Sequence, residues 1–325
     1  MIVPQFWAEG RLQHRQKGRQ VTVRRFGWSD ISQLDAQAHA DQRTHQALQR
    51  IIAGATLGRR EPKVPYNGAE GVPIREEVIS RHGQAIVTRN SYGARCLNTP
   101  NVFFADIDFE NKASFRLTLA ALTTLLLGAA VLGWLMSSKS IFGVCLILAL
   151  FAASPLAGWL QKTSSALKGG PEQAARQRIS RFLAENPGWN LRLYRTPAGL
   201  RVMATHRTFV PSDPQVSQSF SALGTDPVYA LMCLRQQCFR ARVSAKPWRI
   251  GIQDHLRPRP GVWPVAPMHL PGRAAWIARY EARAQDFAAC TFLETLGSGI
   301  IDKDVAPVQQ LHDALCRACS TLPIA

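Results

Sequence analysis

The chain has 325 residues, with 39 Lys and Arg against 22 Asp and Glu, which gives a formal net charge of +17 at pH 7. Its seven cysteines are odd in number and scattered, a pattern that does not suit a disulfide framework, so we expect reduced thiols. Only 8 of the 39 basic residues are lysine. Arginine suits bidentate contact with phosphate, although a genome rich in arginine codons gives the same composition.

Before residue 117 the apolar pattern alternates between helical and strand-like periods. Apolar residues from Leu34 to Ile52 recur with a helical period, and Val21 and Val23 have the spacing of a strand. The pattern predicts, in chain order, a strand within 11–25, helices over 34–52 and 74–80, and strands over 85–88 and 102–108.

Two uncharged apolar stretches follow, residues 117–136 and 141–160, joined only by Ser137-Ser138-Lys139-Ser140. Each has about the 20 residues that a helix needs to cross a bilayer. A buried helical hairpin of a soluble domain is the alternative, but such helices normally keep a polar stripe. The sequence therefore predicts a transmembrane hairpin. Small residues four apart, Ala129 with Gly133 and Ala153 with Ala157, would let the two helices approach closely.

After the hairpin, helices and strands alternate again. The turn Thr196-Pro197-Ala198-Gly199 joins two expected strands. The pattern predicts, in chain order, a helix over 171–185, strands over 189–195 and 200–205, a helix over 226–239, a strand over 240–244, irregular chain over 247–271, a helix over 274–287, a strand over 288–293 and a helix over 305–319.

The expected architecture is an α+β cytoplasmic domain, formed by residues 1–116 and 161–325, that a two-helix transmembrane hairpin interrupts. Two separate domains are the alternative. Residues 1–116 carry a net charge of +6 and residues 161–325 one of +10. Because positively charged flanks stay inside, we expect both termini in the cytoplasm, with the hairpin in a bacterial inner membrane. Its partners are then the lipid bilayer and its anionic headgroups.

Asp106-Ile107-Asp108 ends the expected strand over 102–108. Positions two apart on a strand face the same side, so the two carboxylates should converge. A pair of nearby carboxylates suits Mg²⁺ or Mn²⁺. The alternative is that both side chains mark the solvated end of the strand.

Two basic stretches are candidate anion sites. Arg195 and Arg201 flank the glycine turn, whose backbone amides are expected to help hold phosphate. An ordinary hairpin loop is the alternative there. The second set follows the 226–239 helix and suits either an anion site or a basic surface against lipid headgroups; it comprises Arg240, Arg242, Lys246 and Arg249.

Cys316 and Cys319 form a CxxC pair, and His312 lies one helical turn before Cys316. A structural zinc site normally has four protein ligands, and no second CxxC exists in the sequence. Packing inside a C-terminal helix is therefore the favoured interpretation, with metal binding as the alternative.

The order of elements resembles the catalytic core of archaeo-eukaryotic primases: a DxD strand, a helix, paired strands with a glycine turn, a helix and a basic strand. The resemblance implies that Asp106 and Asp108 hold divalent metal for nucleotidyl transfer. Where that family has a histidine two residues after the glycine, this chain has Arg201 after Gly199. Three short segments also resemble a group of uncharacterised bacterial membrane proteins: Tyr66-Asn67-Gly68, Arg195-Thr196-Pro197-Ala198-Gly199 and Lys246-Pro247-Trp248-Arg249.

Two functions follow from these patterns. The first is a non-enzymatic integral membrane protein whose basic domain binds an anionic partner, namely a lipid headgroup, a nucleotide or a nucleic acid. The second is a metal-dependent enzyme of nucleotidyl or phosphoryl transfer with a degenerate primase-like site. Transport is disfavoured, because two helices without an internal charge offer an ion no path.

Overall fold

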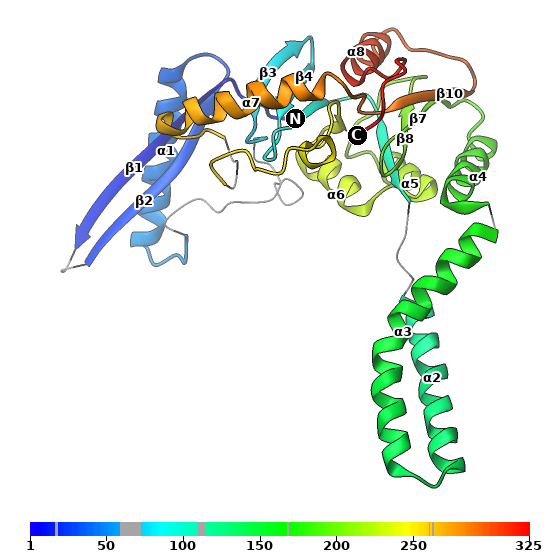
Figure 1. Cartoon of the computed structure of the whole chain (residues 1–325). Helices are drawn as coiled ribbons and strands as arrows, with labels where there is room; N and C mark the ends of the chain where they lie inside the picture. Colours follow the sequence, from blue (N-terminus) through cyan, green and yellow to red (C-terminus); the bar gives the residue numbers. More distant parts are fainter. Residues whose placement is uncertain (17–18, 59–72, 110–114, 168, 260, 262) are drawn as a thin grey trace.

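The computed structural model describes residues 1–325 except 17–18, 59–72, 110–114, 168, 260 and 262 (Figure 1). The Tyr66-Asn67-Gly68 turn lies outside the described residues. The rest of the chain forms an N-terminal arm, a mixed α/β body with two four-stranded antiparallel sheets, and a long helical hairpin.

The N-terminal arm is a β-hairpin covered by one helix: β1 (Phe6–Gln16), β2 (Arg19–Ser29) and α1 (Gln33–Ile52). The Ser32 side chain caps α1 by accepting a hydrogen bond from the Asp35 amide. A Cβ placed on Gly27 would lie 2.1 Å from the Ala40 nitrogen, so glycine allows α1 to pack directly against β2. Helix α1 and strand β2 lie where the sequence predicts a helix and a strand.

The described residues contain ten strands in three sheets, of which two form the body. One sheet has the order β10-β7-β8-β6 and the other the order β3-β4-β5-β9. Their bounds are β3 (Glu77–His82), β4 (Ala85–Arg89), β5 (Arg95–Thr99), β6 (Phe104–Asp108), β7 (Asn190–Arg195), β8 (Gly199–Ala204), β9 (Phe239–Arg242) and β10 (Thr291–Gly297). Strand β6 pairs with β8, and β5 pairs with β9. Each body sheet therefore joins strands that the hairpin separates in the sequence.

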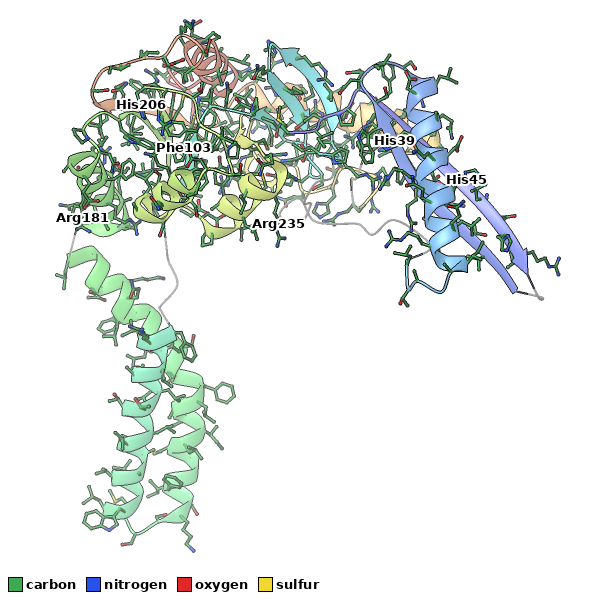
Figure 2. The ribbon with its side chains drawn as sticks, turned by 180° about the vertical axis from the view of Figure 1, so that it is seen from behind. His39, His45, Phe103, Arg181, His206 and Arg235 are labelled. Carbon is green, nitrogen blue, oxygen red and sulfur yellow. The ribbon has the colours of Figure 1, made fainter. Side chains whose placement is uncertain are left out.

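The helices of the body are α4 (Gly170–Glu185), α5 (Pro214–Leu223), α6 (Pro227–Gln236), α7 (Leu270–Ala284) and α8 (Ala306–Cys316), with short 3₁₀ helices η2 (Pro247–Ile250) and η3 (Pro267–His269). Phe103 lies in the interior of the body (Figure 2). Its ring contacts those of Trp189, Phe209, Phe220 and Phe239. These residues come from both sides of the hairpin, so the main hydrophobic core does too.

The hairpin consists of α2 (Phe115–Leu135) and α3 (Lys139–Leu167) and extends away from the body (Figure 1). Both helices are long and apolar enough to cross a membrane by length and composition, and only 11% and 17% of their most apolar windows is buried. That exposure disagrees with a hairpin buried in a soluble core. Ala129 and Gly133 of α2 and Ala153 and Ala157 of α3 are buried, as the small-residue spacing predicts.

The structure differs from the predicted elements in several places. The sequence predicts a helix over 74–80, but Glu77–His82 is strand β3, because Val78 and Ile79 are β-branched and β4 supplies a pairing edge. Helix α5 and strand β5 have no counterpart among the predicted elements. Strand β10 begins three residues later than expected.

Candidate functional site

The DxD residues and Arg201 share one face of the β10-β7-β8-β6 sheet. Asp106 lies directly opposite Arg201 across the β6–β8 pair, and Asp108 lies opposite Gly199. Because side chains alternate along a strand, Asp106 and Asp108 share this face, as predicted. The register places Arg195 opposite Leu200, one position from Arg201, so Arg195 lies on the other face. Arg195 and Arg201 therefore do not form a joint anion site.

Asp106 and Arg201 form a bidentate ion pair. Arg201 Nε donates to Asp106 Oδ1 at 2.7 Å and Nη2 donates to Oδ2 at 3.1 Å. Arg201 is only 2% exposed, whereas the Asp106 side chain is 30% exposed. Burial alone would raise the pKa of Asp106, but the guanidinium outweighs it and the pKa is lowered. Both oxygens that the sequence assigned to a metal thus accept hydrogen bonds from a cation.

Asp108 has the opposite environment. Burial, Asp106 and Asp226 together raise the pKa of the Asp108 carboxyl. Asp226 caps α6 through its side chain, and its backbone amide donates to the Asp106 carbonyl at 2.9 Å. It is a third acidic group near the DxD pair, and its capping position was its only signal in the sequence. A cation near Asp108 would relieve the repulsion among these carboxylates.

Arg242, Lys246 and Arg249 form what we call the basic cluster. They come from the end of β9, the following loop and η2. Burial, followed by repulsion from Arg242 and Arg249, lowers the pKa of Lys246. Burial and then Arg242 likewise lower the pKa of Arg249. Attraction to the Asp108 carboxylate instead raises the pKa of both groups. The basic cluster therefore lies beside the exposed end of β6.

The basic cluster has unused hydrogen-bonding capacity. Arg242 Nε and Arg249 Nη1 are buried and have no hydrogen-bond partner among the described residues. Among the described residues, no ion pair joins Arg242, Lys246 or Arg249 to an acidic side chain. Lys246 Nζ instead lies 5.4 Å from the ring centroid of Trp248, which is 45% exposed.

The other predicted anion-binding groups are already paired. Arg240 Nη2 donates to both carboxylate oxygens of Glu76 at 2.7 Å, and the two side chains are 10% and 12% exposed. Arg195 pairs with Glu172 and lies over the Phe109 ring. These contacts explain the two arginines as parts of the fold.

The glycine turn does not offer its amides to a ligand. Ala198 N and Gly199 N both donate to Thr196 Oγ1, at 3.4 and 3.1 Å. Thr196 N donates to the Gly199 carbonyl at 2.9 Å. These amides are engaged within the turn, which favours the alternative of an ordinary hairpin loop.

Cys316 and Cys319, the two cysteines of the CxxC pair, lie in different environments. His312 and Cys316 are buried on α8, but Cys319 is exposed beyond its end. Their neighbour is Cys290, which precedes β10. Among the described residues, Cys290, His312 and Cys316 are the one group of three or more His, Cys, Asp or Glu residues with the geometry to hold a metal ion.

Comparison with family models, curated proteins and solved structures finds no match to this chain. The resemblances to primases and to uncharacterised bacterial proteins are therefore not tested by any relative.

Proposed function

We propose that the protein is an integral membrane protein whose soluble body binds a phosphate-bearing ligand at the basic cluster. The observation that carries this proposal is the pair of buried guanidinium nitrogens without partners, Arg242 Nε and Arg249 Nη1. Leaving a buried donor unsatisfied costs about 1–3 kcal/mol, and more when the group is charged. A bound oxyanion would supply the missing acceptors and offset the repulsion among the three cations.

The hairpin supports the membrane part of the proposal. Two apolar helices extend from the body with most of their surface uncovered. The segments on both sides of the hairpin are basic. In our proposal the hairpin therefore lies in a bacterial inner membrane, the chain crosses that membrane twice, and both termini are in the cytoplasm. Only eight residues separate Asp108 from Leu117, so the basic cluster would lie close to the anionic membrane surface.

Two sources supply the same phosphate chemistry: a lipid headgroup and a soluble nucleotide or nucleic acid. The exposed Trp248 ring beside Lys246 is a surface on which a base can stack. Binding of inorganic pyrophosphate, of ATP without metal and of vesicles containing anionic lipid would separate the sources. Tighter binding of ATP than of pyrophosphate indicates a nucleotide, and binding to vesicles alone indicates a headgroup.

The test is calorimetric titration of the full chain in detergent micelles. Arg242→Gln and Arg249→Gln should each weaken pyrophosphate binding by about 10-fold or more, because a hydrogen bond to a charged group contributes about 1.5–3 kcal/mol. Arg279→Gln is the matched control, since Arg279 is exposed and already paired with Asp254. Equal affinities of all three variants and the wild-type chain would refute the proposal.

The second candidate is metal-dependent nucleotidyl or phosphoryl transfer. The observation that favours it is the raised pKa of Asp108 beside Asp106 and Asp226, which indicates three acidic groups near one another. A Mg²⁺ or Mn²⁺ ion at Asp106 would have to compete with Arg201 for both carboxylate oxygens. Titration with Mn²⁺ tests this candidate, which fails if Asp108→Asn binds the ion as tightly as the wild-type chain.

A further inference from the structure

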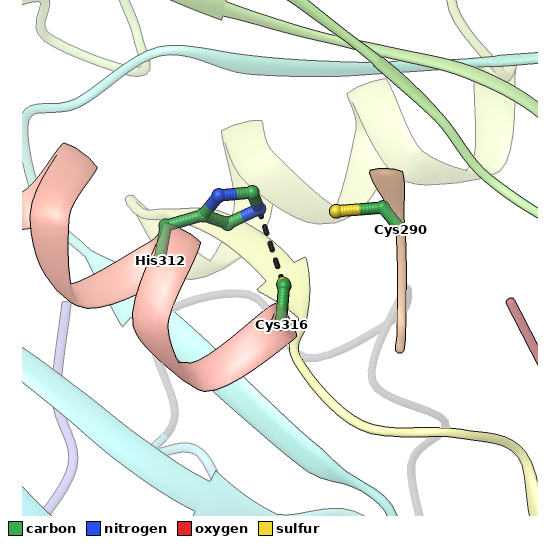
Figure 3. A group of neighbouring side chains, drawn as sticks. All are labelled: Cys290, His312 and Cys316. Atoms are coloured by element: carbon green, nitrogen blue, oxygen red, sulfur yellow. Dashed lines mark hydrogen bonds between the residues drawn. The ribbon is translucent and has the colours of Figure 1, made fainter. Parts of the chain in front are cut away.

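Three side chains with nitrogen or sulfur donors meet next to Arg201, on the face of the β10-β7-β8-β6 sheet that carries Asp106. Cys290 comes from the segment before β10, and His312 and Cys316 come from adjacent turns of α8 (Figure 3). One ligand atom from each lies within 4.8 Å of the others. All three residues have 0% exposure, so the group belongs to the interior.

The spacing within this group matches that of ligands on one metal ion. His312 Nε2 lies 3.4 Å from Cys316 Sγ. A tetrahedral zinc with Zn–N near 2.0–2.1 Å and Zn–S near 2.3 Å holds a nitrogen and a sulfur about 3.6 Å apart. The Cys290 sulfur points toward the His312 ring (Figure 3). The ligand atoms need little movement to share one ion.

A carboxylate already orients the histidine as metal sites require. His312 Nδ1 lies 3.2 Å from Asp313 Oδ1, which leaves Nε2 to face the two sulfurs. Asp313 itself is fixed by Tyr194 Oη and Arg192 Nη2, each at 2.6 Å. A carboxylate on the outer nitrogen of a ligating histidine fixes its tautomer and raises its basicity.

The nearest charged groups already compensate each other. Arg201 Nη1 lies 3.4 Å from His312 Nε2, and Asp106 balances the charge of Arg201. Two thiolates and Zn²⁺ sum to zero charge, so an ion here would leave the Asp106–Arg201 pair compensated. The ion would take the Nε2 lone pair that now faces Arg201.

We infer that Cys290, His312 and Cys316 bind one Zn²⁺ ion. Thiolate and imidazole donors select zinc over Mg²⁺ or Mn²⁺, which prefer oxygen ligands. On binding, two S–H bonds break, two Zn–S bonds form and the two protons pass to solvent. The three protein ligands leave the fourth tetrahedral position to a small ligand such as water. The ion would connect α8 to the start of β10.

The test uses the full chain in detergent micelles, reduced and metal-stripped, and titrated with Zn²⁺ or Co²⁺ alone. Zinc should bind at about one ion per chain, and Co²⁺ should give the thiolate charge-transfer band of a tetrahedral site. Cys290→Ser should weaken zinc binding at least 100-fold, and Asp313→Asn by about 10–100-fold. Cys319→Ser is the matched control and should bind zinc as tightly as the wild-type chain.

A second measurement uses the wild-type chain alone, so its result does not depend on whether a variant folds. Alkylation of the folded wild-type chain, read by mass spectrometry, should show Cys290 and Cys316 protected by zinc and modified faster after chelation. Exposed Cys319 should react equally in both states. Absence of zinc binding, unchanged alkylation of Cys290 and Cys316, or a Cys290–Cys316 disulfide in the chain as isolated would each overturn the inference.

Discussion

The two carboxylates of the DxD strand should respond oppositely to neutralisation. Asp106→Asn leaves Arg201, which is 2% exposed, without its anionic partner. Breaking one side of a buried ion pair costs about 3–5 kcal/mol, and the 30% exposure of Asp106 favours the lower end, about 3 kcal/mol. Asp108→Asn should leave the free energy of unfolding unchanged or slightly higher, because its raised pKa shows that the charged form is disfavoured in the fold.

Acid should distinguish the two effects. The pKa of Asp106 is lowered by folding, so its stabilisation is fully present above the unfolded value of about 3.9 and disappears as pH falls through the folded value. The pKa of Asp108 is raised, so its unfavourable contribution is present at neutral pH and is relieved by acid. The assay is urea unfolding of the full chain in detergent micelles, followed by tryptophan fluorescence at pH 7 and at about pH 4. Equal losses for the two variants at pH 7 would refute this reasoning.

Three further predictions concern packing, the basic cluster and the hairpin. Gly199→Ala should lower the free energy of unfolding by about 1–3 kcal/mol, because its Cβ would lie 2.1 Å from the Ile107 carbonyl, whereas Gly188→Ala, with open space around it, should not. Pyrophosphate affinity should fall as pH rises from about 7 to 10, because the pKa of Lys246 is lowered and its ammonium group loses its charge at a lower pH than an ordinary lysine does. Lys246→Gln should make the affinity less dependent on pH. In spheroplasts, a membrane-impermeant maleimide should label Ser138→Cys without permeabilisation but exposed Cys319 only after it; the reverse pattern would contradict the proposed orientation.

Much of the fold was predictable because its signals are local. The helix that became α1 has a clear helical period, and the apolar stretches that became α2 and α3 are continuous. Strand β3 was mistaken for a helix because its pairing with β4 depends on a neighbour rather than on the segment itself. Helix α5 was missed although Asp213 caps it and a proline begins it, both of which are sequence signals.

The site was predictable only in part, because tertiary contacts decide which arginines are already paired with a carboxylate. The sequence grouped Arg240 with Arg242, yet Glu76 binds Arg240 from a distant segment. The same limit applies to the cysteines. Proximity in sequence favoured Cys319, whereas the tertiary fold brings Cys290 to His312. Partners far apart in the chain leave no periodic signal.

The pairing of β6 with β8 has a consequence for synthesis. Asp106 and Arg201 are 95 residues apart, and the whole hairpin lies between them. At about 5–20 residues per second, a ribosome needs roughly 5–20 s to deliver Arg201 after Asp106. During that interval β6 has no β8 edge and Asp106 has no cation, while α2 and α3 emerge. Completion of the body is thus delayed until after both apolar helices have been made, so the proposed insertion of the hairpin has time to precede folding of the body.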